Sequence, residues 1–109
     1  MKIAAACQKD ILTGINGDNV VFVFFEIDKS GIRSVNEIPF AAGNMEQYAD
    51  FLVKNEVDLL LTPAVSGNSK DILDNAGIHL IDNLCGNVRT LVEAYLAGSL
   101  FDNPKYFIN

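Results

Sequence analysis

Residues 76–100, AGIHLIDNLCGNVRTLVEAYLAGSL, carry the pattern that most restricts how this 109-residue chain can fold. Ile78 to Ile81 is a short apolar run, which is typical of a buried strand. A helix is predicted after Asn87, since Gly86 and Asn87 suit its start and Gly98 suits a left-handed residue at its end. A helix that is apolar on one face must cover a sheet, so the rest of the chain has to supply that sheet. The apolar face consists of Val88, Leu91, Val92, Tyr95 and Leu96.

Four further apolar runs predict the remaining strands. The strongest is Val20–Asp28, VVFVFFEID, because β-branched and aromatic residues dominate it. Lys29-Ser30-Gly31 follows as a hairpin connection to a weaker strand that suits a sheet edge. Thr62-Pro63 stops the run that ends at Leu61, because proline has no N–H with which to continue a strand ladder. The other three runs are Ile3–Cys7, Ile32–Ile38 and Val57–Leu61.

Two more helices are predicted between these strands. Asn44, with Gln47 three residues later, resembles a capping box, and Met45, Tyr48, Ala49 and Leu52 follow as a helical stripe. The segment 65–68 begins a shorter helix that Gly77 closes, with Ile72, Leu73 and Ala76 predicted to point inward.

The element order fixes the simplest topology. A hairpin places the first three strands side by side, and each later helix returns the chain by a right-handed crossover to a parallel strand. The prediction is a three-layer α/β fold: a five-stranded mixed sheet of order 3-2-1-4-5, strand 2 antiparallel, with helices on both faces. Residues 1–100 are expected to form one domain, and residues 101–109 a C-terminal tail.

Charge and composition exclude several classes of partner. The net charge is −6, which disfavours nucleic acid and an anionic membrane surface. The longest apolar run, 20–25, is far shorter than the ~20 residues that span a bilayer, and the apolar run after Lys2 is too short for a signal peptide. We therefore expect a cytoplasmic protein whose two cysteines are reduced.

Three stretches resemble the dinitrogenase iron–molybdenum cofactor biosynthesis family: MKIAAAC, VDLLLTPAVSGNSKDIL and AGIHLIDNLCGNVRTLVEAYLAGSL. The resemblance covers about residues 1–100 and implies a ribonuclease-H-like fold, no catalysis, and the binding or carriage of iron–sulfur or iron–molybdenum clusters. Members of this family often carry His-Phe-Gly after the first strand, with the histidine as expected ligand. Here that loop, 14–19, contains no histidine, cysteine or methionine.

Soft clusters prefer thiolate or imidazole ligands, so Cys7 and Cys85 are the first candidates. Each follows or ends a strand at the carboxyl edge of the predicted sheet, where open α/β sheets bind ligands. With one strand between theirs, their backbones should lie about 10 Å apart, too far for a disulfide. Cys85 also precedes a helix N-terminus, which favours a thiolate and an anionic ligand. The alternative is that both are ordinary free cysteines, Cys7 in the core and Cys85 in a loop.

Other candidates carry weaker signals. The loop Asn16, Gly17, Asp18 and Asn19 would complete the site with oxygen ligands, or is only a turn. Ser66 and Gly67 at a helix start would hold an anion through backbone N–H groups, or act only as a cap. His79 begins the last strand, at the opposite edge from Cys85, and Met45 is expected to serve mainly in packing.

An enzyme is not expected from these residues. A nuclease would need clustered carboxylates for magnesium, yet the first strand has none and Asp58 lies at the start of its strand. The first hypothesis is a cluster-binding accessory protein, or a divergent relative that has lost the usual histidine, with the cluster or cluster-biosynthesis proteins as partners. The second is a protein-interaction module without metal, in which the aromatic tail docks on a partner or a second copy. The tail's aromatic residues are Phe101, Tyr106 and Phe107, and packing against the chain's own core is their alternative role.

Overall fold

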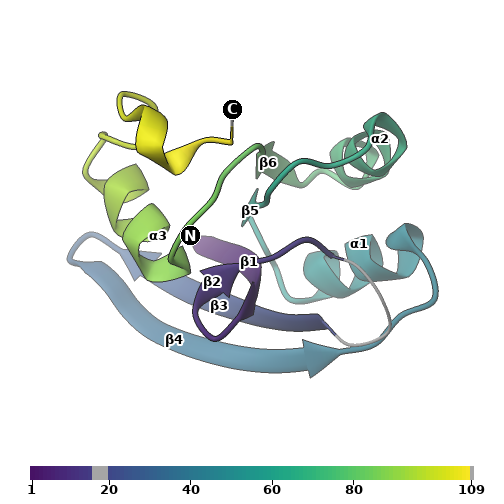
Figure 1. Ribbon diagram of the computed structural model, residues 1–109. Helices are drawn as coiled ribbons and strands as arrows, with labels where there is room; N and C mark the ends of the chain where they lie inside the picture. Colours follow the sequence, from purple (N-terminus) through teal and green to yellow (C-terminus); the bar gives the residue numbers. More distant parts are fainter. Residues whose placement is uncertain (16–19, 109) are drawn as a thin grey trace.

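The computed structural model describes residues 1–15 and 20–108, and it shows one mixed sheet with helices on both faces (Figure 1). Within these residues the sheet has six strands: five lie in the order β4-β3-β1-β5-β6, and the sixth, β2, pairs with β1 outside that path. Strand β3 is antiparallel to β1 and β4, while β5 and β6 run parallel to β1 and each other. The order predicted for five strands is confirmed, and β2 is a sixth strand that the prediction lacks. The strands are β1 (Lys2–Gln8), β2 (Ile11–Leu12), β3 (Val20–Asp28), β4 (Gly31–Phe40), β5 (Leu59–Leu61) and β6 (His79–Ile81).

Strand β2 is the element that the sequence pattern did not predict. It follows a two-residue turn in which Lys9 and Asp10 both have positive φ, 50° and 68°. Such a turn matches the twist of an antiparallel pair, so the chain folds straight back onto β1 and pairs Leu12 with Cys7. Two residues are too few for any periodicity to reveal a strand.

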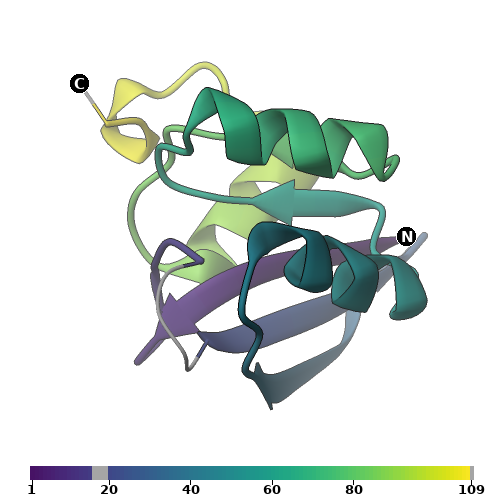
Figure 2. The same cartoon turned by 90° about the vertical axis from the view of Figure 1, so that its right-hand side faces the viewer.

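The helices form the outer two layers. Helices α1 (Met45–Lys54) and α2 (Gly67–Asn75) cover one face of the sheet, and α3 (Val88–Leu96) covers the other (Figures 1 and 2). Two separate cores result, one under α1 and α2 and one under α3. The three-layer arrangement is therefore confirmed. Among the described helices, none has the length and apolar character needed to cross a bilayer.

Helix caps appear where the sequence predicts them. The side-chain oxygen of Asn44 accepts the N–H of Gln47 at 2.9 Å, and that of Asn87 accepts the N–H of Thr90 at 3.1 Å. Gly98 has φ +75°, the left-handed conformation expected just beyond α3. These caps satisfy N–H and C=O groups that a helix end leaves open.

Two inward positions were predicted wrongly. Ala76 is exposed because α2 ends one residue earlier and Ala76 caps it. Leu96 is 39% exposed at the last turn of α3, and Ala94 is buried on that helix instead. Both errors fall at helix ends, where the apolar stripe rotates past the edge of the sheet.

The tail folds back onto its own chain. A short 3-10 helix, η1 (Pro104–Tyr106), leads into a bridge between Phe107 and Leu84. The N–H of Ile108 donates to the Asn83 carbonyl at 2.7 Å. Tyr106 and Phe107 pack against the core under α3, whereas Phe101 remains 66% exposed and stacks on Phe107.

Helix α3 provides a matched test of the core. Leu91 is fully buried and Leu96 is 39% exposed, so Leu91→Ala should lower the free energy of unfolding by about 2–5 kcal/mol and Leu96→Ala by well under half of that. Urea unfolding followed by circular dichroism measures both. Equal losses for the two variants would mean that α3 does not present the face described here.

Candidate functional site

The carboxyl ends of β1, β5 and β6 lie at one edge of the sheet, and a small hollow opens there. Its volume is about 160 Å³. Its lining residues come from the loop after β2, the first turn of α1 and the start of α2, on the face of the sheet that α1 and α2 cover. We call it the edge hollow; it is lined by Gly14, Ile15, Met45, Ala64, Val65, Ser66, Ser69 and Leu73.

The polar wall of the edge hollow is the N-terminus of α2. Ser66 is the N-cap, and its hydroxyl oxygen accepts the N–H of Ser69 at 3.1 Å. Because Val65, Ser66 and Ser69 line the hollow, the positive end of the α2 dipole lies beside it, which favours an anion there. Gly67 follows in the first turn, and a Cβ added to it would meet no atom within 4 Å.

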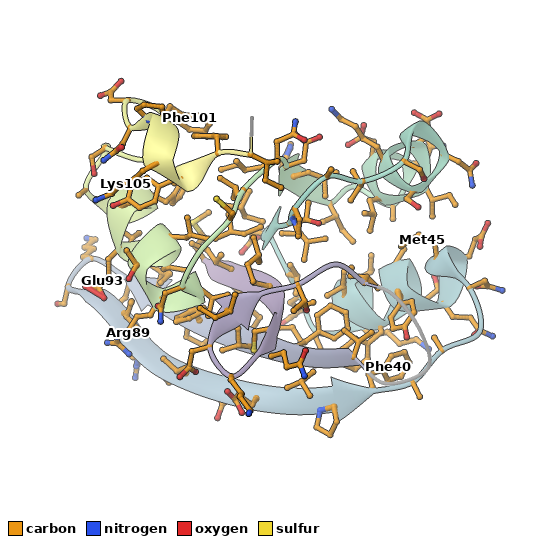
Figure 3. The ribbon with its side chains drawn as sticks, in the orientation of Figure 1. Phe40, Met45, Arg89, Glu93, Phe101 and Lys105 are labelled. Atoms are coloured by element: carbon orange, nitrogen blue, oxygen red, sulfur yellow. The ribbon has the colours of Figure 1, made fainter. Side chains whose placement is uncertain are left out.

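Met45 is the sulfur-containing residue among those that line the edge hollow. It is the first residue of α1, directly after the cap Asn44, and it lies on the side of the helix that faces α2 (Figure 3). Its thioether is a soft, polarisable group that suits copper, iron–sulfur and similar centres better than hard cations. The sequence predicts mainly a packing role for Met45, and Met45 does pack against the core under α1 and α2.

The two cysteines lie on either side of β2. Cys7 is 5% exposed and belongs to the core under α3. Leu12 pairs with Cys7 on one side, and its N–H donates to the Gly86 carbonyl on the other at 2.9 Å. The sequence predicts one strand between the strands of Cys7 and Cys85, and at the level of Cys7 the strand that lies there is β2.

Cys85 is half-buried under the tail. Its N–H donates to the Tyr106 carbonyl at 2.8 Å, and its sulfur lies 3.6 Å from the Lys105 carbonyl. The α3 N-terminus beside it is partly used within the chain, since the Val88 N–H donates to the Asp10 carbonyl at 2.9 Å.

Burial raises the pKa of the Cys7 thiol above its ordinary value, and the negative charges of Glu37 and Asp10 add to the effect. A backbone hydrogen bond with Asp10 opposes it in part. The raised pKa keeps the thiol protonated at neutral pH, and a protonated thiol is a poor metal ligand.

The remaining candidates occupy separate places. Ser66 lines the edge hollow, and Gly67 lies beside it at the start of α2. His79 is exposed at the first residue of β6, hence at the opposite edge from Cys85. Asp58 accepts the N–H of Lys2 at 2.8 Å, also near the amino ends of the strands. The predicted loop residues Asn16, Gly17, Asp18 and Asn19 fall outside the described residues.

Two larger hollows lie along the edge strand β4. One, of about 360 Å³, is bounded by β4 and α1, and the other, of about 440 Å³, by β4 and α3. Neither has a sulfur or imidazole group in its lining. In the residues that the structure describes, no group of three or more His, Cys, Asp or Glu side chains is placed to hold a metal ion.

Comparison of the sequence with known protein families identifies the family of this chain. The sequence profile described as dinitrogenase iron-molybdenum cofactor matches residues 1–98. The chain belongs to this family. The comparison with curated proteins gives no match.

Solved structures share the fold. The crystal structure of PH0822 has a TM-score of 0.80 at 17% identity, covering 90% of each chain. The protein mj0327 from Methanocaldococcus jannaschii has a TM-score of 0.70 at 18% identity, covering 91% of this chain and 90% of that one. The apo form of the orange protein from Desulfovibrio gigas has a TM-score of 0.64 at 24% identity, covering 90% and 88%.

The raised pKa of Cys7 predicts a pH dependence of stability. The group stabilises the folded state fully below the unfolded pKa of about 8.5, and that contribution is lost as the pH rises through the higher folded pKa. The difference in unfolding free energy between the Cys85→Ala protein and the Cys7→Ala/Cys85→Ala protein should therefore shrink as the pH rises above about 8.5. Urea unfolding at several pH values measures it, and a constant difference would show that the Cys7 thiol ionises alike in both states.

Proposed function

We propose that this protein is a small accessory protein that binds and carries an iron–sulfur or iron–molybdenum type cluster at the edge hollow, without catalysing a reaction. The observation that carries the proposal is the position of the hollow in a member of this family. It lies at the carboxyl edge of the parallel strands, where open α/β sheets bind ligands, and a helix N-terminus lies beside it.

The donor set of the edge hollow suits a preformed anionic cluster better than a bare cation. Cluster sulfides accept hydrogen bonds, and the first turn of α2 offers backbone N–H groups and space above Gly67. Met45 offers one soft sulfur ligand. A cluster held this weakly would be released readily, which suits a carrier that passes its cargo to cofactor-assembly proteins.

The cysteine side of β2 is the rival location for the same cargo. Cys85 is half-buried and accessible in part, but Cys7 would have to lose its proton and leave the core to reach a cluster. The protein-interaction reading without metal predicts no uptake at either place. These three alternatives make different predictions for a small set of variants.

Anaerobic reconstitution with ferrous iron and sulfide, and in parallel with isolated iron–molybdenum cofactor, tests the proposal. Visible absorption and bound metal per chain are the readouts. Met45→Leu keeps the side-chain volume but removes the sulfur, and Gly67→Ala adds a methyl group where the cluster would approach the backbone. Each should weaken binding about tenfold, equivalent to 1.4 kcal/mol, and neither should lower the thermal midpoint.

The control is the Cys7→Ala/Cys85→Ala variant, which should retain uptake if the cluster sits in the edge hollow. Loss of uptake in this variant, with Met45→Leu and Gly67→Ala unaffected, would move the site to the cysteines. A wild-type protein that takes up neither cluster would contradict the carrier function and favour the interaction module.

A further inference from the structure

The edge strand β4 is long and has one free side. It spans Gly31–Phe40 and pairs only with β3 in the described part of the chain (Figure 1). Val35, near its middle, is 41% exposed. An edge strand of this length presents a row of N–H and C=O groups that can pair with another strand.

The charges on β4 are arranged symmetrically about Val35. Arg33 and Glu37 are its only charged residues, and each lies two positions from Val35. Both are exposed, and neither takes part in a salt bridge among the described residues. A second copy paired antiparallel about an axis through Val35 would place Arg33 opposite Glu37 twice.

Other pairings bring like charges together or leave both charges unmatched. An antiparallel register shifted so that Arg33 meets itself, or that Glu37 meets itself, creates like-charge contacts. Two antiparallel registers lie between these like-charge registers and the register centred on Val35. In both of them each charged residue lies opposite an uncharged residue. Parallel in-register pairing sets Arg33 against Arg33 and Glu37 against Glu37. The charge pattern thus selects one register.

We propose that β4 pairs with β4 of a second copy of this chain, antiparallel and centred on Val35, to form a dimer with one continuous sheet. The pairing spans residues 33–37. Arg33 is the extra residue of a β-bulge in β4, because Glu26 pairs with Ser34 and Ile27 pairs with Ile32, so regular pairing ends there. Pro39, which has no N–H, limits the pairing at the other end. Because only five residues pair on each side, the dimer is weak and salt-sensitive.

Sedimentation equilibrium of the full chain at low salt, over about 10 μM to 1 mM, tests the dimer. The wild-type mass should rise with concentration. Arg33→Glu or Glu37→Arg alone should raise the dimer dissociation constant about tenfold or more, because two attractive cross-strand pairs become repulsive. Circular dichroism and thermal midpoints check folding, which these exposed substitutions should leave intact.

The decisive measurement is an equimolar mixture of the two single variants. Each position 33 then faces a complementary position 37, so the mixture should form a heterodimer with about the wild-type affinity. The double variant Arg33→Glu/Glu37→Arg should likewise dimerise as the wild type does. Both results would support the proposal.

Three outcomes would overturn it: a wild-type monomer throughout, a dimer indifferent to both charge reversals, or single variants that do not recover on mixing. Phe101→Ala is the matched control for association through the tail, whose exposed ring offers another surface. Loss of the dimer in Phe101→Ala, with the charge variants unaffected, would assign the contact to the tail instead.

Discussion

The structure depends on one constraint, which is that β1 must be bonded on both sides and covered on both faces at once. It pairs antiparallel with β3 and parallel with β5. Ala4 and Ala6 face the core under α1 and α2, while Ala5 faces the core under α3. Small side chains at the centre let both helix layers approach the sheet, and the aromatic residues of β3 and α1 fill the space beside them.

The unequal lengths of the strands determine where a ligand has room. β1 has seven residues, but β5 pairs with only Ile3, Ala4 and Ala5. Beyond that point β2 takes the place of β5 and joins the end of β1 to the Gly86–Asn87 segment. On the α3 side, β2 therefore fills the sheet edge between the two cysteines. Open space at that edge remains on the α1 and α2 side, where the edge hollow lies.

Local patterns were enough to predict most of the fold, and contacts between distant segments account for the rest. β3 has the predicted bounds because seven of its nine residues are β-branched or aromatic and turn-forming residue types flank it in the sequence. The caps Asn44 and Asn87 were predictable because capping acts within four residues. By contrast, β2 exists only through partners such as Gly86, and the hollow only through the approach of Met45 to Ser66. The segments that make these contacts are too far apart in the sequence for a local pattern to reveal them. Pro39 continues β4 only because that strand lies at an edge of the sheet.

The edge hollow and the β4 edge are independent surfaces, and the geometry of antiparallel pairing shows why. An axis through Val35 perpendicular to the sheet would reverse the strand direction of the second copy. The carboxyl edges of the two sheets, and the hollows with them, would then face opposite ways. In two copies joined through β4, the two edge hollows would not form one shared site. Dimerisation would therefore double the number of edge hollows per assembly without changing the residues that line either of them.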